Sequence, residues 1–155
     1  MREFEIVEYD WDECAHLIND ANRQVIASGL FLTPVVDSKT GERIFKVFIE
    51  KAVRARMTEA QYNAALLHEE AHYVFDRERL LSAPQGAIFD IEMEARADRY
   101  AIEKGADPQD LFEANLIVLA HYYKRVGLTC EEAKLEGSDM IKKMLTYPYY
   151  KEVKV

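Results

Sequence analysis

The sequence predicts an α+β fold that is mostly helical and contains one small β-hairpin. Capping boxes followed by apolar residues at helical spacing predict the helices, and one alternating stretch after a glycine turn predicts the hairpin. The chain has 155 residues, of which 49% are hydrophobic and 31% charged, as is ordinary for one globular core. No repeat or linker divides the chain, so we expect residues 1–155 to form a single domain.

The expected elements follow one another with short connections. In chain order they are a helix at 10–28, strands at 30–37 and 43–51, helices at 58–80, 88–104, 107–125 and 129–146, and an irregular tail. Capping boxes open three of the helices: Asp10 with Glu13, Thr58 with Gln61, and Thr129 with Glu132. Asp107 and Pro108 suit the N-cap and first position of a fourth helix. Pro34 favours an edge position for the first strand because proline cannot donate to a sheet.

Charge and hydropathy argue against two classes of partner. The chain has 20 Lys and Arg against 28 Asp and Glu, and a net charge of -8 does not suit a surface for nucleic acid. No apolar run approaches the 18 or so residues of a membrane helix, and the first residues lack a secretory pattern. We therefore expect a cytoplasmic protein with no membrane and no nucleic-acid partner.

The helix expected at 58–80 contains the motif H-E-x-x-H. His68 and His72 lie one turn apart on one helical face, where two imidazole nitrogens can share one zinc ion (Zn²⁺). Glu69 follows the first histidine, so its carboxylate leans to the side of the metal and can accept a proton from a zinc-bound water. The alternative is a chance spacing on a solvated face rich in glutamate.

A catalytic zinc needs a third protein ligand and an open fourth position. An antiparallel return of the next helix would place Glu94 beside the histidine pair, and Asp98, one turn on, could accept a hydrogen bond from a ligand imidazole. Ala97 and Ala101 allow the two helices to approach closely. Glu92 is the rival ligand, but it lies about 200 degrees from Glu94 around the helix, so Glu94 is preferred.

These motifs resemble those of the gluzincin metallopeptidases, in which H-E-x-x-H is followed on a second helix by E-x-x-A-D or E-x-x-A-N. The match covers residues 68–100, about a fifth of the chain, with H-E-E-A-H and E-A-R-A-D-R-Y in those positions. The short gap between the motifs, the small chain and the preceding hairpin are most similar to the ImmA/IrrE-type proteins of bacteria and mobile elements, or to the small soluble minigluzincins.

The resemblance implies a zincin-like fold and a zinc-dependent endopeptidase with a strand beside the cleft that pairs with extended substrate. It also implies roles for individual residues. The zinc ligands would be His68, His72 and Glu94, the general base and acid would be Glu69, and the hydrogen-bond partner of a ligand would be Asp98.

Two further features have alternative interpretations. His121 is a candidate catalytic residue that could donate to the oxyanion of the reaction, although a single histidine on an apolar helix is more often packed and satisfied. Tyr147, Tyr149 and Tyr150 could form a lid, dock a partner, or simply cover exposed core.

The sequence thus predicts a zinc metallopeptidase that hydrolyses a peptide bond in a cytosolic protein. The protein or peptide substrate is expected to lie extended along the strand 43–51. One alternative is a zinc-binding regulatory protein whose site is structural or sensing and which binds a partner such as a repressor. Another is a latent peptidase whose terminal tail occupies the cleft, and the oligomeric state is left open.

Overall fold

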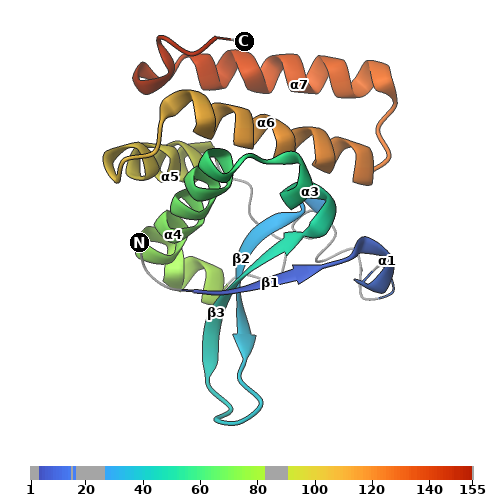
Figure 1. The fold of residues 1–155 in the computed structure, drawn as a ribbon, viewed down its shortest axis with the longest axis vertical. Helices are drawn as coiled ribbons and strands as arrows, with labels where there is room; N and C mark the ends of the chain where they lie inside the picture. Colours follow the sequence, from blue (N-terminus) through green and yellow to red (C-terminus); the bar gives the residue numbers. More distant parts are fainter. Residues whose placement is uncertain (1–3, 15, 17–26, 83–90, 155) are drawn as a thin grey trace.

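The computed structural model describes residues 4–14, 16, 27–82 and 91–154 and has an α+β fold (Figure 1). Its elements are β1 (Glu5–Tyr9), α1 (Trp11–Cys14), β2 (Leu30–Val36), β3 (Arg43–Glu50), α3 (Lys51–Arg56), α4 (Glu59–Ser82), α5 (Ile91–Glu103), α6 (Pro108–Arg125), α7 (Cys130–Leu145) and the short 3₁₀ turn η2 (Pro148–Tyr150). The predicted fold class is confirmed.

The predicted hairpin is present as β2 and β3. The two strands pair antiparallel, from Leu30 opposite Ile49 to Val36 opposite Arg43. Gly41, in the connecting turn, has a φ of 72°, a conformation that glycine adopts without steric cost. The proline of β2 lies on an edge strand, as expected, because the strand order is β1-β3-β2.

The sheet has one strand that the sequence analysis did not predict. β1 runs parallel to β3, with Glu5 opposite Lys46 and an ion pair of 3.0 Å between their side chains. β3 therefore lies in the middle of the sheet and pairs on both sides. The expectation that substrate pairs with residues 43–51 is wrong for this reason, and β2 is the strand beside α4 whose outer edge has no strand neighbour in the described part of the chain.

Local capping explains where the long helices begin. At α4 the Thr58 hydroxyl accepts from the Gln61 backbone N–H at 3.1 Å, and the Gln61 side chain accepts from the Thr58 N–H at 3.0 Å. Asp107 caps α6 and Thr129 caps α7 through their side-chain oxygens. The strand expected at residues 43–51 ends at Glu50, because α3 begins at the next residue, Lys51.

Parts of three segments expected from the sequence lie outside the described residues. Of the helix expected at 10–28, the structure describes α1, while residues 15 and 17–26 lie outside the described residues. The loop at 83–86 and the start of the helix expected at 88 also lie outside them. The tail, expected to be irregular, contains η2.

The helix α4 lies between two apolar clusters. One joins the sheet, α3, α4 and α6 and includes Val47, Ile49 and Ala65; the other joins α4 to α5, α6, α7 and η2 and includes Ala64 and Phe112. Figure 1 shows α5, α6 and α7 on one side of the sheet and the tip of the hairpin extending away from them. Packing on both sides fixes the position and rotation of α4.

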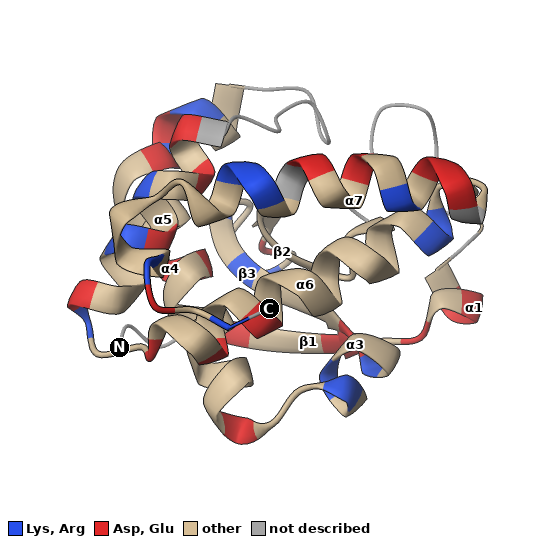
Figure 2. Ribbon diagram, turned by 90° about the horizontal axis from the view of Figure 1, so that it is seen from above, with Lys and Arg blue, Asp and Glu red and all other residues tan. Residues whose placement is uncertain are grey.

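The helix α7 forms the outer layer of the helical part. Figure 2 shows acidic residues in its first turn and basic residues in its last turn, which matches the direction of the helix dipole. Among the described residues, none of the helices combines the length and apolar character needed to cross a membrane.

Candidate metal centre

The helix α4 buries ionisable side chains where a helix in a core normally buries apolar ones. These buried residues are His68, Glu69, Glu70, His72 and Asp76. Burying such groups costs free energy unless each finds a hydrogen bond or an opposite charge. Neighbouring α4 positions hold alanines, which let α5 and α6 approach and supply those partners.

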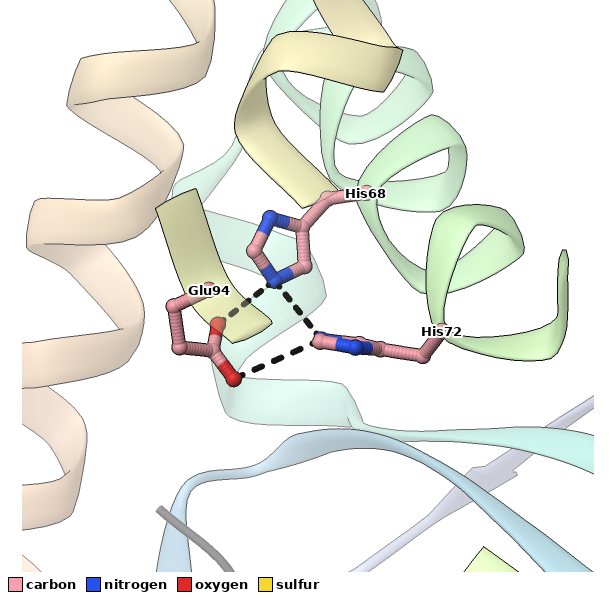
Figure 3. Close-up of side chains that lie close together, drawn as sticks. All are labelled: His68, His72 and Glu94. Atoms are coloured by element: carbon pink, nitrogen blue, oxygen red, sulfur yellow. Dashed lines mark hydrogen bonds and ion pairs between the residues drawn. The ribbon is translucent and has the colours of Figure 1, made fainter. Parts of the chain in front are cut away.

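The structure brings together the three residues expected to bind zinc. His68 Nε2 lies 3.1 Å from His72 Nε2 and 2.8 Å from one Glu94 oxygen, and His72 Nε2 lies 3.4 Å from the other Glu94 oxygen. Figure 3 shows the three side chains converging on one point from α4 and α5. Glu92, the rival ligand, is exposed on α5 and is not part of this group.

The other ring nitrogens determine which atoms face that point. His68 Nδ1 lies 2.7 Å from Asp98 Oδ1, and His72 Nδ1 lies 3.0 Å from Asp76 Oδ2. A carboxylate can only accept, so each Nδ1 carries a proton and Nε2 is the ring nitrogen that faces the centre. Both imidazoles are therefore oriented so that Nε2 can bind a metal in place of a proton.

The spacing of the ligand atoms fits a zinc ion. Zinc holds nitrogen and oxygen ligands at about 2.0–2.2 Å, which separates two ligands of a tetrahedral site by about 3.3 Å. The observed separations run from 2.8 to 3.4 Å. The two Nε2 atoms, 3.1 Å apart, repel each other unless one proton or a metal cation lies between them. Three protein ligands leave a fourth tetrahedral position for water or substrate.

The charges around the centre favour a cation. Burial would lower the pKa of His68 and of His72, but the nearby Glu94 carboxylate and the carboxylates at Nδ1 have a larger, opposite effect. The pKa of His68 is therefore raised well above its usual value, and the pKa of His72 is raised to about 9. Burial would raise the pKa of Glu94, yet the two imidazoles hold it well below its usual value. The same field that stabilises protons on the imidazoles stabilises a metal cation that replaces them.

Glu69 lies in the wall of a cavity of about 650 Å³ that also contains the three ligand residues. Burial raises the pKa of its carboxyl, and the two imidazoles and a hydrogen bond from the Leu32 backbone oppose that rise. Residues 30–32 of β2 line the same cavity. A buried carboxylate therefore stands beside the candidate ligands, next to an edge strand.

Each carboxylate that holds an imidazole is itself held by other side chains. Asp98 was expected in this role from the sequence, whereas Asp76 was not, although its spacing of four residues from His72 places both on one helical face. An Arg96 nitrogen lies 2.6 Å from Asp76 Oδ1, so this arginine of α5 pairs with a carboxylate of α4. Asn115 and Tyr150 donate to Asp98.

His121 is not brought to this centre. Its imidazole contacts the buried carboxylate of Glu50, which also pairs with Arg125 at 2.7 Å. His121 is not among the described residues that line the cavity. Gly29 packs against it so closely that a Cβ there would lie 2.8 Å from His121 Cδ2. The packed interpretation of His121 fits the structure, and the expected role at the oxyanion has no geometric support.

Comparisons with protein families, with curated proteins and with solved structures found no match for this chain. A functional proposal therefore depends on the residues of the centre themselves.

Replacing either histidine should remove the metal without unfolding the chain. We expect about one zinc per purified chain, and His68→Ala or His72→Ala should abolish it because two ligands hold zinc poorly. The helical circular dichroism signal should persist, since neither imidazole belongs to the apolar clusters. His16→Ala, at an exposed position, is the control. Full zinc content in either variant would contradict the ligand assignment.

The two glutamates of α5 should differ sharply. Glu94→Ala removes a carboxylate from the cluster and should weaken zinc binding by more than about 100-fold. Losing a residue that only hydrogen-bonds to a metal ligand typically costs about 10- to 100-fold in affinity. Glu92→Ala, two residues away and exposed, should leave the dissociation constant nearly unchanged. Competition with a chromogenic chelator measures both, and equal losses would show that Glu94 is not a ligand.

Proposed function

We propose that this chain is a zinc-dependent endopeptidase that hydrolyses a peptide bond in a cytosolic protein or peptide. The observation that carries the proposal is the buried Glu69 carboxylate, which shares a cavity with the His68, His72 and Glu94 cluster. A zinc site that only stabilised the fold would have no use for a base beside an open ligand position. This combination supports hydrolysis over the regulatory alternative.

When bound, zinc would supply a Lewis acid that polarises a carbonyl and lowers the pKa of a water molecule to about 7. Glu69 would take the proton of that water as it attacks the peptide carbonyl. Burial raises the pKa of Glu69 towards the working pH, which favours a group that must accept a proton and then return it. The same carboxyl would deliver the proton to the leaving amine.

The edge of β2 is the proposed binding surface for the substrate backbone. β2 pairs with β3 on one side, and residues 30–32 line the cavity. An extended peptide that added a strand to this edge would be held by main-chain hydrogen bonds, with its carbonyl groups passing the cluster. This arrangement replaces the pairing with residues 43–51 expected from the sequence.

Glu69→Gln should separate hydrolysis from zinc binding. Glutamine keeps the size of the side chain but cannot accept a proton at neutral pH, so cleavage should fall by roughly 10² to 10⁴ while zinc content stays unchanged. Cleavage of a random synthetic peptide library, followed by mass spectrometry, gives the rate, and metal analysis of the same samples gives the zinc content.

Glu70→Gln is the matched control for this variant. Glu70 is the adjacent residue, is equally buried, and accepts from the Tyr100 hydroxyl at 2.9 Å, away from the cluster. Its rate should stay within a few-fold of the native rate. If the zinc-loaded native chain cleaves no peptide, or if Glu69→Gln cleaves as fast as the native chain, the proposal of an endopeptidase fails.

A further inference from the structure

The C-terminal turn η2 contacts Asp98, the carboxylate that holds one of the candidate metal ligands. Tyr150 is buried, with 1% of its surface exposed, and its ring packs edge-on against Phe112 at a centroid distance of 5.5 Å. Its hydroxyl donates to Asp98 Oδ2 at 2.8 Å. The last turn of the chain thus contacts the carboxylate that holds the His68 imidazole, 82 positions earlier in the sequence.

Asp98 is almost completely buried and has three partners among the described side chains. His68 Nδ1 lies 2.7 Å from Oδ1, the Asn115 amide lies 3.2 and 3.3 Å from the two oxygens, and the Tyr150 hydroxyl is the closest donor to Oδ2. No arginine or lysine pairs with this carboxylate in the described part of the chain. Apart from the His68 imidazole, the groups that stabilise its negative charge are therefore neutral hydrogen-bond donors.

The Tyr150 hydroxyl is a dependable donor at this place. Burial and then the Asp98 charge raise the pKa of Tyr150 far above its usual value, so the hydroxyl keeps its proton. Without it, the buried Oδ2 would lack its shortest hydrogen bond, and the carboxyl group would rotate away from His68 towards another partner. That rotation would weaken the hydrogen bond that holds the His68 ring in its metal-binding orientation.

We propose that Tyr150 is a positioning residue for the metal centre, and that docking of the C-terminal turn sets the affinity of the chain for zinc. The inference rests on the proposed zinc site but not on peptidase activity. The contrast with the other imidazole supports it: Asp76 is held by Arg96, whose side chain is 49% exposed, whereas Asp98 depends on the buried tail.

Contacts on both sides of Tyr150 keep the turn in place. The Tyr149 hydroxyl donates to the Ala95 carbonyl at 2.9 Å, within the helix that carries Glu94. Beyond the turn, the Gln109 amide exchanges two hydrogen bonds with the Lys154 backbone, at 2.8 and 2.9 Å. The tail is therefore anchored to α5 and to α6. The Tyr150 hydroxyl is the group of this anchored tail that holds Asp98 in place.

The variant Tyr150→Phe tests the inference because it removes this hydroxyl and keeps the buried ring. Zinc affinity, measured by competition with a chelator, should fall about tenfold. This is the smallest loss typical when a residue that positions a metal ligand by hydrogen bonding is removed. Tyr100→Phe, which removes a hydroxyl that donates to the buried carboxylate of Glu70 and does not touch Asp98, should change the affinity by less than about twofold. Thermal unfolding of the zinc-free proteins checks that both variants are folded.

A double-mutant cycle with Asp98→Asn distinguishes positioning from general loosening of the tail. If the hydroxyl acts through the carboxylate, Tyr150→Phe should have little further effect on zinc affinity in the Asp98→Asn background. Unchanged affinity in Tyr150→Phe, or an equal loss in both backgrounds, would overturn the inference while leaving the zinc site standing. Absence of zinc binding by the native chain would overturn the inference together with the proposed function.

Discussion

The structure depends on one constraint: α4 carries ionisable side chains into the interior, and these must satisfy one another there. His68 and His72 each use Nδ1 to donate to a buried carboxylate, which turns both Nε2 atoms towards Glu94. The arrangement is costly without a proton or a metal cation at its centre, because it brings the two Nε2 atoms within 3.1 Å of each other. A core of ordinary apolar residues would have avoided this cost, so the cluster has the character of a site kept for function.

The rest of the fold follows from the need to supply partners to α4. The helix α5 contributes Glu94 and Asp98 on successive turns, α6 contributes Asn115, and the C-terminal turn contributes Tyr150. The sheet contributes the edge of β2, where the Leu32 backbone reaches Glu69. Segments from nearly the whole length of the chain therefore meet around one turn of helix. This explains how a small chain can hold several buried charges: each of these elements contributes at least one hydrogen bond or ion pair.

Much of the fold could be predicted because its signals are local. Capping boxes and turn residues mark where α4, α6 and α7 begin, and the spacing of four residues between His68 and His72 places both on one face. The contacts that the sequence does not reveal are those between distant segments. β1 has only five residues and is stabilised by its pairing with β3, and Tyr150 lies 52 positions from Asp98. His121 carries no local signal that distinguishes a packed imidazole from a catalytic one, and only its contact with Glu50 does so.

X-ray absorption at the zinc edge, on the purified full chain loaded with one equivalent of zinc, tests the central claim most directly. The geometry predicts two imidazole nitrogens from His68 and His72 together with oxygen ligands, all at about 2.0–2.2 Å, and no sulfur. A sulfur ligand at about 2.3 Å would place the metal at a cysteine, and a spectrum with fewer than two imidazoles would remove zinc from the histidine pair. Either spectrum would contradict the assignment of this cluster as the metal centre.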